Sequence, residues 1–402
     1  PVSVAIVGGG IGGLCLAIGL LQHPHLKVTV YEAAPAFKEI GAGLALGPNA
    51  QRALHLISPA AAEAFCSQAT PNTSAEFQRT WFEFRHGIQG PDDGAVLGKV
   101  ENETGQQTAH RAKFLHELVN LIPEGVGRFG KQLVRIEERG PAEKVVLHFA
   151  DGETAVADCL IGADGVHSVA RKHLLVNEED ALAAVFSGIV AYRGLIPMET
   201  AVANLGEFAS DSYMWTGEGG MVMTYPIDFG KTLNVVAARY GRESWDEPTY
   251  VVQSDAATLE KDYKGWGDIP SKVIEMVEQP TLWAMLEHPP APFYNHGNVA
   301  MMGDAAHATT PFQGAGAGQA IEDALVLSNL LRYVKSASHV APALAAYDAV
   351  RRERSQKVVV TSREAIEQYG LDNDIVKGDV KRWRDLWSQR MKWIWDIDLV
   401  KQ

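Results

Sequence analysis

The chain opens with a strand, a glycine-rich turn, a helix and a second strand, and this order constrains its fold more than any other feature. Residues 4–7 form an apolar, β-branched run typical of a buried strand. Residues 14–21 are apolar, contain no proline and are long enough for a helix. A second β-rich run, residues 27–31, ends in Glu32. We therefore predict a parallel β-α-β unit at the start of an α/β fold.

The turn after the first strand has the spacing G-x-G-x-x-G, with glycines at Gly8, Gly10 and Gly13. In this pattern the first glycine permits a tight turn, the second lets the backbone approach a pyrophosphate, and the third lets helix and strand pack closely. The helix N-terminus adds free N–H groups and a positive dipole end. Glu32 follows about 20 residues later, where an acid binds a ribose hydroxyl. These features favour a dinucleotide site over a glycine-rich packing turn.

A second copy of the same spacing, at Gly125, Gly127 and Gly130, serves as an internal control. It follows a helical stretch and Pro123, and it leads into a strand-like segment, residues 132–138. Because the strand before it and the helix after it are missing, we predict a turn and a strand edge there.

The pattern of the remaining chain predicts two domains and a helical tail. Residues 185–285 contain alternating, aromatic segments typical of an antiparallel sheet, and residues 76–100 indicate a hairpin around the turn GPDDG. Residues 131–161 predict three strands. The predicted boundaries are 1–75, 101–180 and 286–340 for the dinucleotide-binding domain, 76–100 and 181–285 for a substrate domain, and 341–402 for a C-terminal, Trp-rich helical segment packed on the core.

The composition argues against several functions. A net charge of −13 disfavours a broad nucleic-acid-binding face. No unbroken apolar run reaches the roughly 18 residues of a membrane helix, and no basic segment precedes the apolar N-terminus as it would in a secretory signal. Cys15, Cys66 and Cys159 are odd in number and far apart, which fits a reducing compartment and offers neither a disulfide framework nor a zinc site. We expect a cytoplasmic monomer or homodimer without a metal.

Two later stretches place polar residues directly after strand-like runs. In GADGVHS, Asp164 fits either a helix N-cap or a position beside a ligand at the carboxyl end of a strand. In MMGDAAH a buried strand ends at Gly303 and Asp304, and a glycine-rich loop and a helix follow, so a second part of the same ligand could be anchored there. Three other polar residues need no functional explanation from the sequence alone. Arg111 fits a solvated position on a helix, and Arg193 and Tyr225 fit strand positions whose side-chain tips reach solvent.

Four stretches together resemble a known family. They are GGGIGG with Glu32, HRAKFL with Arg111, GADGVHS, and GDAAHATTPFQGAGAGQ. In this order they resemble the single-component FAD-dependent aromatic hydroxylases of the p-hydroxybenzoate hydroxylase type, over nearly the whole chain. The segments EIGAGLALGPNA, AYRGLIP, MTYPI and WIWDIDL make the chain most similar to the fungal salicylate hydroxylase-like branch, which also includes enzymes that dearomatise polyketide phenols.

The resemblance implies a Rossmann-like FAD-binding domain, a mostly antiparallel substrate domain and a role for each candidate residue. It implies that Gly8, Gly10 and Gly13 hold the FAD pyrophosphate, that Glu32 binds the adenosine ribose, and that Arg111 reaches the phosphates or the ribityl chain. It also implies that Gly303 and Asp304 of the GD motif bind the ribityl hydroxyls, that Ala45 lies against the flavin, and that Ala317 lies near the flavin pyrimidine edge. Asp164 would lie near both FAD and the reduced nicotinamide. Arg193 and Tyr225 would contact the substrate.

The implied reaction is hydroxylation of a phenol. NADH or NADPH would reduce FAD, and O2 would give a flavin C4a-hydroperoxide that a phenolate attacks. The protein must then lower the pKa of the phenol. Arg193 suits this task because it stays charged and its fork fits an oxyanion or carboxylate, and Tyr225 could donate to the same oxygen or move its proton. The expected substrate is salicylate or a related ortho-substituted phenol.

The sequence is also compatible with two alternatives. One is oxidative dearomatisation of a resorcylic polyketide aldehyde, which would give a ketone without decarboxylation. The other is a flavin-fold binding protein without oxygenase activity, which should lack the combined GD motif, glycine-rich loop and Arg/Tyr pair. One departure bears on the substrate: Phe312 stands where several relatives carry a histidine, which leaves room for a neutral or larger aromatic molecule.

Overall fold

The first predicted strands and helix form the centre of a mostly parallel sheet. The computed structural model describes residues 1–37, 43–138, 140 and 143–401. Strand β1 (Val2–Val7) lies between β12 and β2, and the β-branched runs are buried because helices and loops cover the sheet. The six strands follow the order β19 (Asn295–His296), β20 (Val299–Met301), β12 (Cys159–Gly162), β1, β2 (Leu26–Tyr31) and β8 (Gly127–Arg128), and all pairs except β19–β20 are parallel.

Small residues let helices pack closely beside this sheet. Helix α1 (Ile11–Leu21) follows the glycine turn and packs on α11 (Gly316–Leu331). A Cβ at Gly19 would lie 2.7 Å from Ser328 of α11, so the glycine allows this approach. The other helices near the central sheet are α2 (Pro48–Ile57), α3 (Pro59–Cys66), α4 (Arg111–Val119), α5 (Val169–Leu174), α6 (Glu179–Leu182) and α10 (Asp304–His307).

A second, larger sheet carries the alternating segments of the middle of the chain. Its strands follow the order β17 (Val251–Gln253), β18 (Thr281–Glu287), β13 (Val185–Pro197), β16 (Thr232–Arg239), β15 (Gly220–Ile227), β14 (Tyr213–Gly217), β5 (Thr80–His86) and β6 (Val96–Glu101). All pairs are antiparallel except β14–β5, which confirms the predicted sheet and the hairpin of β5 and β6. One face packs on α7 (Met198–Leu205), α8 (Ala256–Asp262) and α9 (Asp268–Glu275).

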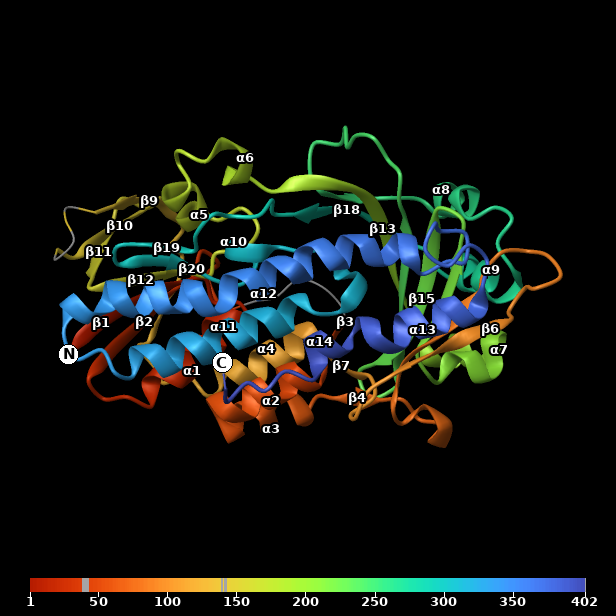
Figure 1. The fold of residues 1–402 in the computed structure, drawn as a ribbon, viewed down its shortest axis with the longest axis horizontal. Helices are drawn as coiled ribbons and strands as arrows, with labels where there is room; N and C mark the ends of the chain where they lie inside the picture. The colour runs from red at the N-terminus through yellow and green to blue at the C-terminus, as the bar shows by residue number, and fades with distance from the viewer. Residues whose placement is uncertain (38–42, 139, 141–142, 402) are drawn as a thin grey trace.

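The C-terminal helices join the two sheets. Figure 1 shows α12 (Val340–Gln368) running along the long axis of the molecule, from the central sheet toward the larger one. Helices α13 (Val380–Arg390) and α14 (Lys392–Trp395) return beside it. The rings of Trp383 and Trp387 lie 5.1 and 5.5 Å from the ring of Phe84 on β5, so the tryptophans pack on the core as predicted.

The prediction of three strands for residues 131–161 was incomplete, because the structure adds a fourth strand directly before the third predicted run, residues 158–164. Strands β9 (Leu133–Glu137), β10 (Val145–Phe149) and β11 (Thr154–Ala157) form a small antiparallel sheet, whereas β12 joins the central sheet. Asp158 lies between β11 and β12. Its carboxylate accepts hydrogen bonds from the backbone N–H and the hydroxyl of Ser3, at 2.8 and 2.6 Å, and so fixes the chain where it changes sheets.

The remaining short elements complete the architecture. Strands β3 (Gly43–Ala45), β7 (Gln107–His110) and β4 (Thr70–Pro71) form a third antiparallel sheet, and 3-10 helices cover residues 75–77, 206–209, 311–313 and 337–339. The second glycine copy contributes β8, an edge strand, as predicted. Gly41 and the start of the EIGAG segment lie outside the described residues. Across the described chain, none of the helices has the length and apolar character that crossing a membrane requires. The domain boundaries remain a prediction.

Candidate functional site

One cavity of about 870 Å³ has walls from both large sheets. It brings together every site residue predicted from the sequence. These are Gly8, Gly10, Gly13, Glu32, Ala45, Arg111, Asp164, Arg193, Tyr225, Gly303, Asp304 and Ala317. Residues as far apart in the chain as Gly8 and Ala317 therefore meet at one site, which includes both the dinucleotide fingerprint and the Arg/Tyr pair.

The glycine turn has the geometry of a phosphate cradle. Gly8 has a φ of 109°, and a Cβ there would collide with the carbonyl oxygen of Ala163. A Cβ at Gly10 would meet nothing within 4 Å, so this residue borders open space. Gly10 is also the N-cap of α1 and has no side chain to cap it, which leaves the first N–H groups of the helix for a ligand.

Glu32 connects the end of β2 to the glycine turn. Its Oε2 accepts a hydrogen bond from the backbone N–H of Gly9 at 2.7 Å, and its Oε1 accepts one from Ala34 at 2.8 Å. The carboxylate lines the cavity and keeps further acceptor capacity, since each oxygen accepts more than one bond.

Asp164 is not the N-cap of α5, although it supports the start of that helix. The N-cap of α5 is Ser168, whose hydroxyl donates to Asp164. Asp164 Oδ2 also accepts from the backbone N–H groups of Val169 and Ala170, at 2.7 and 3.2 Å. Burial raises the pKa of Asp164, and these hydrogen bonds oppose that change. The residue therefore supports the start of α5 from outside the helix while it lines the cavity.

The GD motif is held from behind by a buried acid. After β20 the chain turns at Gly303, whose φ is 58°, and the Gly303 N–H donates to Asp323 Oδ2 at 2.9 Å. Asp304 begins α10 and is exposed on the cavity side. His307, at the end of α10, places Nε2 at 2.6 Å from the same oxygen of Asp323. One carboxylate oxygen thus fixes both ends of this turn.

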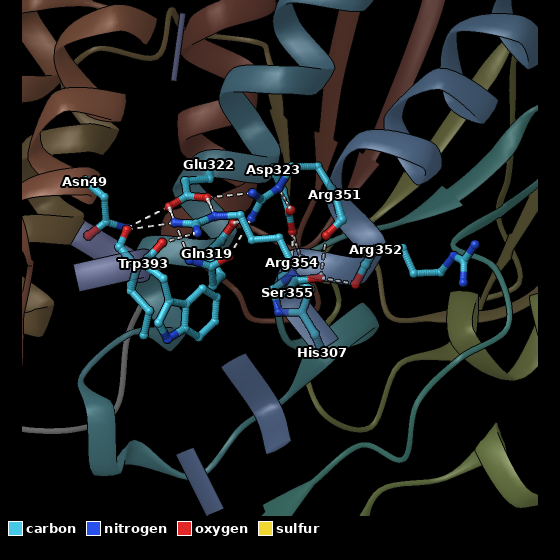
Figure 2. A network of polar contacts seen from close by, with 12 residues as sticks. Asn49, His307, Gln319, Glu322, Asp323, Arg351, Arg352, Arg354, Ser355 and Trp393 are labelled. Atoms are coloured by element: carbon cyan, nitrogen blue, oxygen red, sulfur yellow. Dashed lines mark hydrogen bonds and ion pairs between the residues drawn. The ribbon is translucent and has the colours of Figure 1, made fainter. Parts of the chain in front are cut away.

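Figure 2 shows that Asp323 belongs to a buried ionic network between α11 and α12. Arg351 Nε lies 2.8 Å from Asp323 Oδ1, and Arg351 Nη1 lies 2.5 Å from Glu322 Oε2. Arg354 Nε lies 2.8 Å from the same Glu322 oxygen, and Asn49 of α2 donates to Glu322 Oε1 at 2.6 Å. Burial opposes ionisation of Asp323, but His307 and Arg351 outweigh it and hold its pKa at about 2.

Sequence reasoning did not identify this network. The available signal was an acid pair inside an apolar helix, QAIEDALVL, with the arginine-rich segment RRERS on a later helix. Figure 2 shows the two sets of side chains facing one another in the interior. The network supports α11, whose N-terminal residues Gly316 and Ala317 line the cavity.

The larger sheet presents Arg193 and Tyr225 on one face. Arg193 pairs with Val236, Tyr225 pairs with Asn234, and directly opposed residues share a face. The guanidinium carbon of Arg193 lies 4.4 Å from the ring centroid of Trp283. Burial lowers the pKa of Arg193, and the nearby Tyr225 opposes this shift. Burial raises the pKa of Tyr225, and Arg193 opposes that shift in turn.

Arg193 has an unused donor. Its Nε is buried and has no hydrogen-bond partner among the described residues, and no described carboxylate lies within ion-pair distance of its guanidinium. The walls around it are mostly apolar and include Met221, Met223, Trp283 and Phe312. The cavity therefore has, at this end, a half-buried cation in a hydrophobic setting.

Comparison with known proteins identifies the family. Residues 110–362 match the family model described as an FAD binding domain, and residues 6–37 match an NAD(P)-binding Rossmann-like domain. The chain belongs to the FAD-dependent aromatic hydroxylases. It is 61% identical to a 6-methylsalicylate 1-monooxygenase of Aspergillus terreus, over 100% of this chain and 90% of that protein. It is 39% identical to a salicylate hydroxylase of Pseudomonas putida, over 98% of this chain and 92% of that protein.

A solved structure supports the same assignment. A salicylate hydroxylase substrate complex matches 100% of this chain and 97% of its own chain, with a TM-score of 0.89 and 36% sequence identity. The predicted fold is confirmed, as are the assignment as an FAD-dependent aromatic monooxygenase, the salicylate hydroxylase-like group, and FAD with NAD(P)H as cofactor and cosubstrate.

The residues of the cavity fit FAD. The open space at Gly10 and the N-terminus of α1 offer room and backbone donors for a pyrophosphate. The N-terminus of α11 is a second helix start at the same cavity, with Ala315 as its N-cap. Glu32 and Asp304 add carboxylate acceptors suited to hydroxyl groups.

Proposed function

We propose that this hydroxylase acts on a 2-hydroxybenzoate, either salicylate or an alkyl-substituted salicylate, and converts it to a catechol with loss of the carboxyl group. The observation that carries this proposal is the Arg193 guanidinium, whose Nε is buried and which lines the cavity without a carboxylate partner among the described residues. A buried charge is costly unless it is paired. An anionic aromatic acid provides that pair, and only when it enters the site.

The roles of the cofactor-facing residues are part of this proposal. Gly8, Gly10, Gly13 and the N-terminus of α1 would hold the FAD pyrophosphate. Glu32 would accept from the adenosine ribose, Arg111 would contact the phosphates or the ribityl chain, and Gly303 and Asp304 would hold the ribityl hydroxyls. Ala45 and Ala317 would border the flavin, and Asp164 would lie near FAD and the reduced nicotinamide. When bound, FAD supplies hydride acceptance from NAD(P)H and the activation of O2.

The substrate-facing residues would prepare the phenol for attack. Arg193 stabilises negative charge on the substrate and so favours the phenolate, which is far more nucleophilic than the phenol at its ring carbons. Tyr225 holds or moves the phenolic proton at its hydroxyl oxygen. The apolar walls exclude water, which limits wasteful loss of oxidising equivalents as hydrogen peroxide.

The wall at Phe312 favours a substituted ring. Phe312 is buried, lines the cavity, and its ring lies 6.4 Å from the ring of Tyr369 on the C-terminal segment. An aromatic residue there offers apolar contact and no hydrogen bond. A methyl group on the salicylate ring would be accommodated better by this wall than a further polar substituent. The similarity to a 6-methylsalicylate 1-monooxygenase supports this choice.

The experiment that tests the proposal is product identification with the purified FAD-loaded enzyme. Salicylate, 6-methylsalicylate and a resorcylic aldehyde are supplied with NADH or NADPH, and products are measured by mass against reductant consumed. A catechol formed in equal amount to oxidised reductant is the expected result. Hydrogen peroxide alone from both salicylates would contradict it, and a ketone from the aldehyde would favour dearomatisation. We also propose a cytoplasmic location and a monomeric or homodimeric state.

Substitutions in the glycine turn should separate folding from cofactor binding. Gly10→Ala is expected to fold normally, because its Cβ would point into open space, yet to bind FAD on the order of tenfold more weakly because that space is the phosphate cradle. Gly8→Ala is the matched comparison and is expected to impair folding, because φ is 109° and the Cβ meets backbone. Circular dichroism melts and FAD fluorescence titrations measure both effects. Unchanged FAD affinity in Gly10→Ala would contradict the role.

A further inference from the structure

Asn234 is a third polar side chain on the face that carries Arg193 and Tyr225. It lies on β16, directly opposite Tyr225 on β15 and Leu195 on β13, while Arg193 pairs with Val236, two residues further along β16. Opposed residues and residues two apart share a face in an antiparallel sheet. Asn234 is 4% exposed and lines the cavity.

The amide of Asn234 lacks a partner within the protein. Its Nδ2 is buried and makes no hydrogen bond to any residue that the structure describes. Buried amide donors are nearly always bonded, because leaving one unbonded costs the free energy of its desolvation. An Asn in the otherwise apolar core-facing positions of β16 therefore indicates an acceptor supplied from the cavity.

The charges around the cavity define which acceptor fits. The carboxylates among its described lining residues are Glu32, Asp164 and Asp304, and all three follow strands of the central sheet. The face of the larger sheet contributes the donors of Arg193, Tyr225 and Asn234 among apolar neighbours. Three donors without an acid suit a substrate that carries two oxygen substituents and negative charge.

We propose that Asn234 is a substrate-contact residue whose Nδ2 donates to the phenolic oxygen beside Tyr225, while Arg193 binds the carboxylate. Asn234 and Tyr225 are directly opposed, so their polar atoms can converge on one oxygen, whereas Arg193 lies one residue pair away, over Trp283. The site thus distinguishes an aromatic acid with an ortho hydroxyl from one without it. This inference rests on the proposed function.

The test compares two ligands that differ only in the hydroxyl group. Salicylate and benzoate are titrated calorimetrically into FAD-loaded wild type, Asn234→Leu and Asn234→Asp. In Asn234→Leu, salicylate is expected to bind about tenfold more weakly, because one hydrogen bond to a charged group is lost. Benzoate is expected to bind with unchanged affinity. Asn234→Asp, nearly identical in shape, should weaken salicylate further because an acceptor replaces the donor.

Two comparisons make the outcome decisive. Leu195 also pairs with Asn234, but it is 51% exposed and does not line the cavity. Leu195→Ala should therefore leave the affinities for salicylate and benzoate unchanged. Arg193→Met should weaken both ligands, since both carry a carboxylate. Equal loss of salicylate and benzoate in the Asn234 variants, or no loss of salicylate in Asn234→Asp, would overturn the inference and leave the proposed function standing. Failure of wild type to bind either ligand would overturn both.

Discussion

Arg193→Met is expected to lower coupled hydroxylation by about a hundredfold or more, the size typical for removal of a group that stabilises a developing oxyanion. The variant keeps the length of the side chain and its apolar contact with Trp283, but it removes the cation that favours the phenolate. FAD should remain bound, because none of the residues proposed to hold the cofactor lies on the larger sheet that carries Arg193. The measurements are catechol formed per NAD(P)H oxidised, hydrogen peroxide released, and flavin content from the visible spectrum.

Arg193→Lys is the companion variant because it retains the charge and loses the planar fork. It should bind FAD normally and show intermediate activity with part of the reductant diverted to hydrogen peroxide. If either variant hydroxylates with full coupling, Arg193 has no role in activating the phenol. A variant that loses FAD as well would assign Arg193 to the cofactor rather than to the substrate.

Asp323→Ala is expected to lower the free energy of unfolding by about 3–5 kcal/mol, because it leaves the buried Arg351 with one carboxylate partner fewer. It should also weaken FAD binding, since Gly303 and His307 lose the oxygen that fixes their turn. Denaturant unfolding of the apo and FAD-loaded forms measures the first effect, and a fluorescence titration measures the second. Asp385→Asn, which breaks an exposed ion pair with Lys381, should change neither quantity measurably.

The acid dependence of stability provides a separate check on Asp323. Its pKa in the folded protein is about 2, below the ordinary value near ~3.9 for the unfolded chain. A lowered pKa means that its stabilising contribution is complete above about pH 4 and is lost as the pH falls toward 2. Asp323→Asn should therefore lose less stability than wild type over that interval. Equal acid sensitivity of the two proteins would show that this carboxylate is not held ionised by the network.

The glycine turn that lines one part of the cavity could be predicted because its signals are local. In the glycine turn, residues close in sequence are also close in space, so the spacing of Gly8, Gly10 and Gly13 carries the geometry of the turn directly. The same argument separated this turn from the second glycine copy, which lacks a following helix and forms an edge strand. The buried β-branched runs likewise indicated the parallel sheet.

The part of the cavity formed by the larger sheet depends on strand pairing, which no short segment of sequence records. Arg193, Tyr225 and Asn234 each have a plain reading within their own strands, and the first two were singled out only through resemblance to a family. Their common face follows from the pairing of β13, β15 and β16. Strand β11 was missed for a similar reason, because the hydrogen bonds that fix the chain at Asp158, between β11 and β12, come from Ser3, which is 155 residues away in the sequence.

The sequence by itself determined the β-α-β unit, the dinucleotide fingerprint and the two sheet types, because periodicity and turn chemistry act within about ten residues. Only the tertiary structure decided which polar side chains share the cavity and which charges are paired. Glu322 and Asp323 on α11 meet Arg351 and Arg354 on α12 because two helices pack in the interior. Burial makes such pairs strong and unpaired groups costly, so the fold, rather than the residue type, places Asp323 in a paired network and leaves Arg193 facing the cavity.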